Sequence, residues 1–151
     1  MGELGSYVDA VEAVRLPVNQ LLNGADPIIA AYRAHRITPA AASGRMGALE
    51  KRFAAYLVQM DAIAPANPAL ARINAPYART YLLEDSYLAT LASDLEGGDF
   101  GNLPDTQDQQ RLAIIGWRTQ LQLAASRAGF PLPADIQQAG RGEIAPGVTG
   151  S

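Results

Sequence analysis

The stretch that decides the fold is YVDAVEAVRLPVNQLLNGADPIIAAY, residues 7–32. Its apolar positions recur at alternating steps of four and three, at Tyr7, Val11, Val14, Val18, Leu21, Ala25, Ile28 and Tyr32. A sustained repeat of this kind is typical of a helix that buries one face against other helices. The repeat keeps its phase across Pro17 and across residues 23–27, which read Asn-Gly-Ala-Asp-Pro. We therefore expect a kinked or broken first helix whose two parts face the same core.

Capping residues followed by proline mark where the later helices begin. Asp26 can cap a second part of the first helix that begins at Pro27, because a proline at the first helical position loses no hydrogen bond. The same signal at Thr38-Pro39 and Asn67-Pro68 opens two further long helices, and Asp105 or Thr106 opens the last one. We expect these three helices to end near Ile63, at Gly97-Gly98 and at Gly129, with one further turn across residues 134–138.

Four long amphipathic segments joined by short connections predict an all-α fold, an up-down-up-down four-helix bundle with a short C-terminal extension. A chain of 151 residues can form one domain with a proper core. Because no internal repeat or linker divides it, we expect a single helical-bundle domain over residues 3–139. Glycine and polar residues dominate from Gly140 onward, so residues 140–151 are expected to form a flexible tail.

Composition excludes several classes of function. The formal charge of −3 argues against a nucleic-acid partner, because neutralising phosphates needs a basic surface. The chain has no cysteine, so it has no disulfide, thiolate metal site or thiol nucleophile. No run of apolar residues is long enough for a membrane span. Met1-Gly2 followed at once by a patterned helix suggests a removed leader, which would make this a bacterial protein that is exported or associated with the envelope; without such a leader, a cytoplasmic location is expected.

Glu84 is the one charged position in the apolar stripe of the third long helix. A carboxylate in a bundle core is costly unless it is paired, so Glu84 indicates a general base or ligand contact, an ion pair that fixes the helix register, or a register offset after Pro76 that leaves it on the rim of the bundle. Arg118, beside Trp117 on the last helix, is the expected partner. Arg15 and Arg52 border other stripes in a similar way.

Tyrosines on the predicted inner faces point to the same region. Tyr77 and Tyr81 precede Glu84 by two turns and one turn, and their hydroxyls need polar partners if they are buried. One interpretation is a polar pocket between the helices for a small ligand, formed by Tyr77, Tyr81, Glu84 and Arg118. The other is an ordinary core whose tyrosines direct their hydroxyls toward the bundle ends.

A second cluster of polar residues stands at the end of the opening stripe. Arg33, His35 and Arg36 share one turn, where positive charge suits the C-terminus of a helix. This cluster indicates either a small anion site or a solvated helix end.

No residue pattern indicates catalysis, a metal or a cofactor. A di-iron bundle needs two Glu-x-x-His motifs, and the chain has a single histidine and none of these motifs. Zinc-ligand spacing, a phosphate-binding glycine loop and a Gly-x-Ser-x-Gly motif are also absent from the sequence. We therefore assign no catalytic residue, no metal ligand and no cofactor.

Three functional hypotheses follow. The leading one is a non-enzymatic helical-bundle module that binds an unknown small molecule or protein. The alternative is an enzyme or small-ligand-binding protein that uses a polar pocket around Glu84, Tyr81 and Arg118. A third is a homo-oligomer whose apolar stripes bury against a second copy.

Overall fold

A computed structural model describes residues 2–101 and 103–139 of the chain. It is built from helices, and no strand occurs in these residues. The helices are α1 (Gly2–Leu22), α2 (Ala25–Arg33), α3 (Pro39–Asp61), α4 (Pro68–Gly97), α5 (Gln107–Ala128) and the single turn α6 (Ala134–Gln137). The all-α bundle predicted from the sequence is confirmed, with α1 and α2 as the two parts of a broken first helix.

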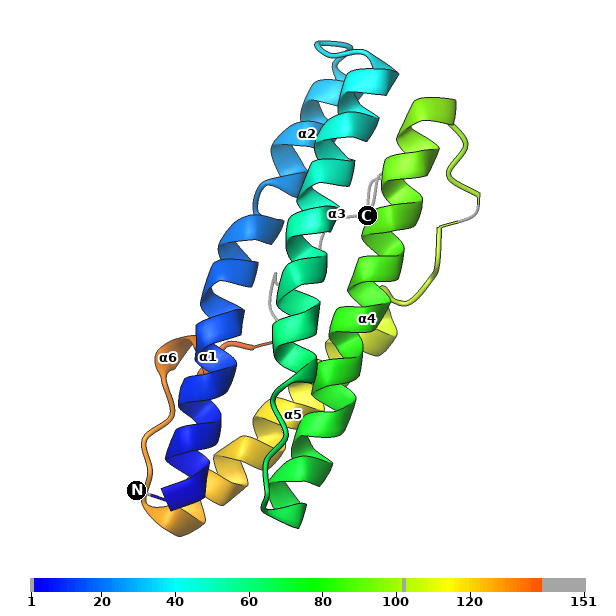
Figure 1. Cartoon of the computed structure of the whole chain (residues 1–151). Coiled ribbons are helices and arrows are strands. Elements are labelled where there is room, and N and C mark those ends of the chain that lie inside the picture. Colours follow the sequence, from blue (N-terminus) through cyan, green and yellow to red (C-terminus); the bar gives the residue numbers. More distant parts are fainter. Residues whose placement is uncertain (1, 102, 140–151) are drawn as a thin grey trace.

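The helices lie side by side along the length of the molecule (Figure 1). Helices α1 and α2 follow one another as a bent rod, and α3 runs back along both of them. Helix α4 packs extensively on α3, and α5 packs on α4 and crosses the lower half of the molecule. Helix α6 returns beside α1. The N-terminus, the α3–α4 connection and the α5–α6 turn therefore meet at the lower end.

The break in the first helix falls where it was expected, but its cap is different. Helix α2 begins at Ala25, and Gly24 before it has helical dihedral angles (φ −73°, ψ −13°) and no side-chain cap. Asp26 lies inside the first turn, so the prediction that Asp26 caps α2 is wrong. The Gly24 amide donates to the Leu21 carbonyl oxygen at 3.0 Å. Because the backbone stays close to helical through this turn, the chain re-enters a helix before Asp26 is reached.

The caps of α3 and α4 are confirmed. Thr38 accepts a hydrogen bond from the Ala41 amide at 3.0 Å, and Asn67 accepts from the amides of Ala69 and Leu70 at 2.8 and 3.3 Å. Helices α4 and α5 end at the left-handed residues Gly98 (φ +74°) and Gly129 (φ +65°), as the glycine signals predicted.

The first six positions of the opening stripe are buried. These are Tyr7, Val11, Val14, Val18, Leu21 and Ala25. Ile28 and Tyr32, at the upper end of the stripe, are half-buried. Tyr32 packs edge-on against Phe100 of the α4–α5 connection, with the ring centroids 6.1 Å apart. The upper end of the bundle is thus closed by a loop, whereas α5 closes the lower half. The expected tail over residues 140–151 lies outside the described residues.

Candidate functional site

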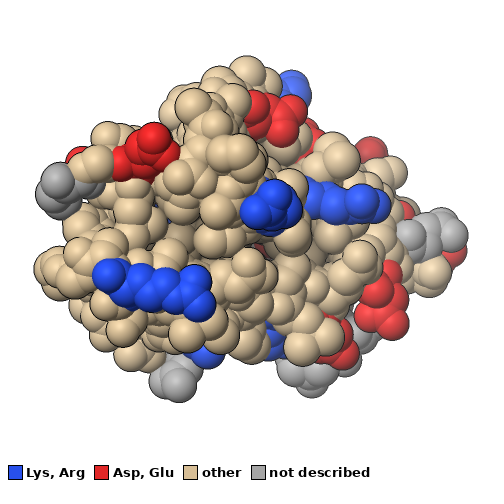
Figure 2. Space-filling view, turned by 90° about the horizontal axis from the view of Figure 1, so that it is seen from below, with Lys and Arg blue, Asp and Glu red and all other residues tan. Residues whose placement is uncertain are grey.

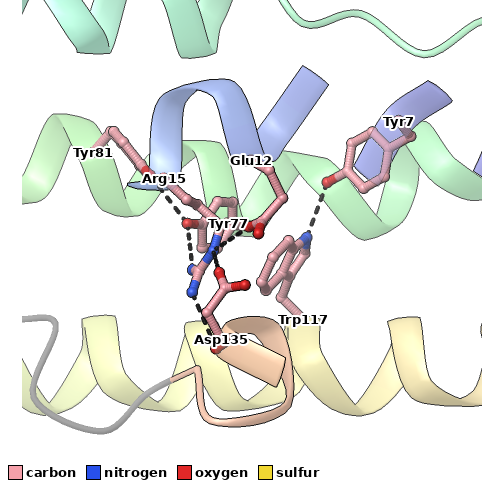
Figure 3. A network of polar contacts seen from close by, with 7 residues as sticks. All are labelled: Tyr7, Glu12, Arg15, Tyr77, Tyr81, Trp117 and Asp135. Atoms are coloured by element: carbon pink, nitrogen blue, oxygen red, sulfur yellow. Dashed lines mark hydrogen bonds and ion pairs between the residues drawn. The ribbon is translucent and has the colours of Figure 1, made fainter. Parts of the chain in front are cut away.

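Arg15 is the centre of a buried polar network (Figure 3). Its side chain is only 1% exposed, although it carries a full positive charge. Its Nη1 donates to the Tyr77 hydroxyl at 2.8 Å. The guanidinium carbon lies 5.2 Å from the ring centroid of Trp117 and 5.8 Å from that of Tyr77, within the range of a cation–π contact. Helices α1, α4 and α5 therefore meet around one guanidinium.

Two carboxyl groups flank the same guanidinium. Glu12 lies one turn before Arg15 on α1, and its Oε1 is 3.3 Å from Arg15 Nε. Asp135 comes from α6, with Oδ2 at 3.6 Å from the same Nε, and its backbone oxygen accepts from Arg15 Nη2 at 3.5 Å. One cation thus contacts two carboxyl groups. The ionisation of Glu12 therefore depends on the charges of Arg15 and Asp135.

The environment of Glu12 favours its neutral form. Burial, and then the hydrogen bond and charge of Asp135, raise the pKa of Glu12 to about 7, while Arg15 acts in the opposite direction. Glu12 therefore keeps its proton up to a pH of about 7. Sequence reasoning missed this pair, because 123 positions separate its two members (135 minus 12) and no motif links them.

A second branch of the network runs through Tyr7. The Trp117 indole N–H donates to the Tyr7 hydroxyl at 2.9 Å, and that hydroxyl donates to Asn74 Oδ1 at 2.6 Å. Burial raises the pKa of Tyr7, so the phenol remains a neutral donor and acceptor. Trp117 also stacks on Tyr77 with 3.9 Å between the centroids and 15° between the ring planes. This branch holds α1, α4 and α5 in one register.

The residues predicted to form a polar pocket lie around a very small cavity. Tyr77, Tyr81 and Glu84 line it together with Thr80 and Gln110, and its volume is about 30 Å³. The Tyr77 and Tyr81 hydroxyls are 3.0 Å apart. Glu84 is buried, at 3% exposure. A space of this size has no room for a metabolite.

The expected pairing of Glu84 with Arg118 requires correction. Arg118 Nη1 donates to the Ala139 backbone oxygen at 2.9 Å, so its guanidinium binds the segment that follows α6. The physical reason is its position one residue after Trp117. Successive helical residues point about 100° apart, so Arg118 faces away from the core that Trp117 enters. Arg15 is the arginine that reaches the tyrosines.

The predicted anion cluster lies far from this network, in the turn that follows α2. Helix α2 ends at Arg33, and Arg33, His35 and Arg36 are all exposed. His35 adopts a left-handed conformation (φ +56°), and the Arg36 amide donates to the Ala31 carbonyl oxygen at 2.9 Å. The three side chains share one exposed turn, and their role in anion binding stays a prediction.

A larger hollow lies at the lower end of the bundle. It has a volume of about 630 Å³ and separates the first turns of α1 from the α3–α4 connection. We call it the end groove; its lining residues are Gly2, Glu3, Ser6, Tyr7, Asp9, Ala10, residues 62–67 and Leu70. A neighbouring hollow of about 770 Å³ shares Gly2, Glu3 and Asn67 with the end groove and reaches residues 128–131.

The surface around the end groove is largely uncharged. Figure 2 looks onto this end of the molecule and shows wide uncharged areas between scattered charged side chains. Among the described residues that line the two hollows, the charged ones are Glu3 and Asp9, both acidic. The sequence contains the uncharged runs 62–68 and 128–134, but nothing in it indicates that they meet beside the start of α1.

Comparison of the chain with protein-family models, with curated proteins and with solved structures finds no match. Over residues 2–101 and 103–139, no group of three or more acidic or histidine side chains is placed to hold a metal ion. None of the helices in this part of the chain has the length and apolar character needed to cross a membrane.

Proposed function

We propose that this protein is a non-enzymatic helical-bundle binding module that takes an apolar ligand with a positive charge in the end groove. The observation that carries the proposal is the chemistry of the groove lining. Its floor is built from alanine, isoleucine, proline and leucine side chains, and its charged residues are Glu3 and Asp9. An apolar floor with an acidic edge favours a ligand that has an apolar body and a cationic group.

The size of the groove supports the same proposal. A volume of about 630 Å³ lies within the range of sites that bind small organic molecules. The apolar floor supplies most of the binding free energy, and the two exposed carboxylates supply charge selectivity. We assign no reaction to the groove.

The polar pocket around Glu84, Tyr81 and Arg118 is the weaker candidate. Its cavity of about 30 Å³ has room for water alone. The Tyr77 hydroxyl already accepts from Arg15, and Arg118 binds the Ala139 carbonyl group instead of facing the cavity. A ligand there would have to displace core side chains, whereas the end groove is open in the structure as it stands.

Three probes with the same ring and different charge test the proposal. These are 1-naphthylmethylamine (a cation at pH 7), 1-naphthalenemethanol (neutral) and 1-naphthoate (an anion). We expect the amine to shift the NMR signals of residues 2–10 and 62–67, with an affinity several-fold above that of the alcohol, as about 1 kcal/mol of charge interaction implies. Binding of the naphthoate with equal affinity, or shifts confined to other residues, would overturn the proposal.

Removing the two charges provides the matched variant. In the double variant Glu3→Gln and Asp9→Asn, the amine should bind no better than the alcohol, while the affinity for the alcohol stays unchanged. Asp108→Asn is the control, because Asp108 is 95% exposed, pairs with Arg111 and does not line the groove. If that control reduced the preference for the amine equally, the selectivity would come from overall net charge rather than from the groove.

A further inference from the structure

Residues 130–139 form a short cover over the Arg15 network. The segment contains α6, a single helical turn, with Pro131 and Pro133 before it. Ile136 and Ala139 are completely buried, and Leu132 is 8% exposed. In Figure 3, Asp135 extends from α6 toward Arg15, and its carboxyl group lies beside that of Glu12 at the same guanidinium nitrogen.

Polar contacts from two other helices hold this cover in place. From α1, Arg15 reaches both the carboxylate and the backbone oxygen of Asp135. From α5, Arg118 donates to the Ala139 backbone oxygen at 2.9 Å. Asp135 is 31% exposed, so water and protons reach this cluster without unfolding of the bundle.

The charges at the contact balance only while one carboxyl group keeps its proton. With Glu12 protonated, its O–H faces Asp135, and the Asp135 carboxylate balances the Arg15 guanidinium. With Glu12 ionised, two adjacent carboxylates face one guanidinium. Within the described residues, the other side chains placed at Arg15 are the Tyr77 hydroxyl of α4 and the Trp117 ring of α5, neither of which is a carboxylate or a second cation, while Arg118 binds a carbonyl oxygen.

We propose that residues 130–139 are a pH-dependent cover of the Arg15–Trp117 network, closed by a proton that Glu12 and Asp135 share and loosened when that proton leaves. The cover is a regulatory element beyond the proposed binding function. It also lies next to the neighbouring hollow, since Phe130 and Pro131 line that hollow. Loosening of the cover therefore changes the wall that Phe130 and Pro131 form in the hollow next to the end groove.

The expected size of the effect follows from linkage. The pKa of Glu12 is raised from 4.5 to about 7 when the cover is closed, so the closed state binds the proton more tightly than an open state with an ordinary pKa. The cover is therefore most stable at low pH and loses stability as pH rises through 7. For one such group, the open fraction should increase about tenfold between pH 6 and pH 8.

Hydrogen exchange of the α6 amides measures this opening directly. The amides of Ile136, Gln137, Gln138 and Ala139 each donate to a backbone oxygen within the cover. Their protection factors, corrected for intrinsic exchange, should fall about tenfold from pH 6 to pH 8. The fluorescence of Trp117, the single tryptophan of the chain, should shift to the red over the same range. Protection factors that do not change with pH would overturn the proposal.

Two single substitutions separate the cover from a general effect of pH. Glu12→Gln keeps a donor toward Asp135 and cannot ionise, so its α6 protection should stay constant from pH 6 to pH 8. Glu50→Gln is the matched control, since a contact with Asp85 at the α3–α4 interface raises the pKa of Glu50 to about 7 as well. The control should retain the tenfold change at α6. If both variants lost it, or if Glu12→Gln kept it, the shared proton would not be the cause.

Discussion

At the scale of the residue, single polar groups fix how three helices meet. The Tyr7 hydroxyl connects Trp117 of α5 with Asn74 of α4, and all three side chains are buried. A buried polar group that loses its partner costs more than the hydrogen bond itself contributes, because the remaining partner cannot return to water. Tyr7 therefore matters more for stability than its place in an apolar stripe suggests.

Tyr7→Phe should lower the free energy of unfolding by about 1–3 kcal/mol, because it leaves the Trp117 N–H and an Asn74 lone pair without this partner. Urea unfolding followed by Trp117 fluorescence measures the change. Tyr56→Phe is the control, because Tyr56 is half-buried and its hydroxyl makes no hydrogen bond within residues 2–101 and 103–139. Equal losses in the two variants would show that ring packing, not the hydroxyl network, is responsible.

At the scale of the element, local sequence decides where helices start, but only where a side chain reaches the first free amides. Thr38 and Asn67 have extended backbone conformations and accept hydrogen bonds from amides two or three residues ahead. Gly24 takes the corresponding position before α2 with helical dihedral angles, and no side chain caps that helix. Asp26 can then act only through the helix dipole.

Thr38→Ala should destabilise the protein by about 1 kcal/mol through loss of the α3 cap. Asp26→Ala should cost about half of that or less, because an exposed charge in the first turn contributes only a screened dipole interaction. Thermal unfolding of the two variants compares them under the same conditions. A greater loss in the Asp26 variant would restore Asp26 as the cap of α2 in solution.

At the scale of the whole molecule, two carboxyl pairs join helices across the bundle. Glu12 and Asp135 link α1 to α6, and Glu50 and Asp85 link α3 to α4. The hydrogen bond with Asp85, and then burial, raise the pKa of Glu50 to about 7. The raised pKa values mean that Glu12 and Glu50 keep a proton in the folded protein at a pH where the unfolded chain has released it.

Global stability should therefore fall as pH rises from 5 to 8. The pKa values of Glu12 and Glu50 are raised from 4.5 to about 7 on folding, so the folded state binds more protons between these values, and the stability present at low pH is lost as pH rises to about 7. We expect a loss on the order of 1–3 kcal/mol once solvent screening is allowed for. Urea unfolding at pH 5 and pH 8 tests this, and the double variant Glu12→Gln, Glu50→Gln should reduce the difference. Greater stability at pH 8 would contradict the assignment of both pairs.

The candidate sites could be predicted only in part. Tyr77, Tyr81 and Glu84 lie on one face of a single helix, so their spacing alone indicated that they would meet. Arg118 was assigned to the same cluster from its place beside the stripe, but the rotation of α5 turns it toward Ala139. The end groove was not predicted, since it depends on two segments, residues 2–10 and 62–70, that are distant in the sequence.

The sequence by itself determined the helices, their apolar faces and most of their ends, because periodicity and capping depend on neighbours within a few residues. The tertiary structure alone decided which polar groups meet. Arg15 contacts both Glu12 and Asp135, and a groove with an apolar floor and an acidic edge opens beside the start of α1, because helix rotation and packing set these contacts. The four-three repeat of residues 7–32 thus specifies a buried face, and the bundle around it determines what that face touches.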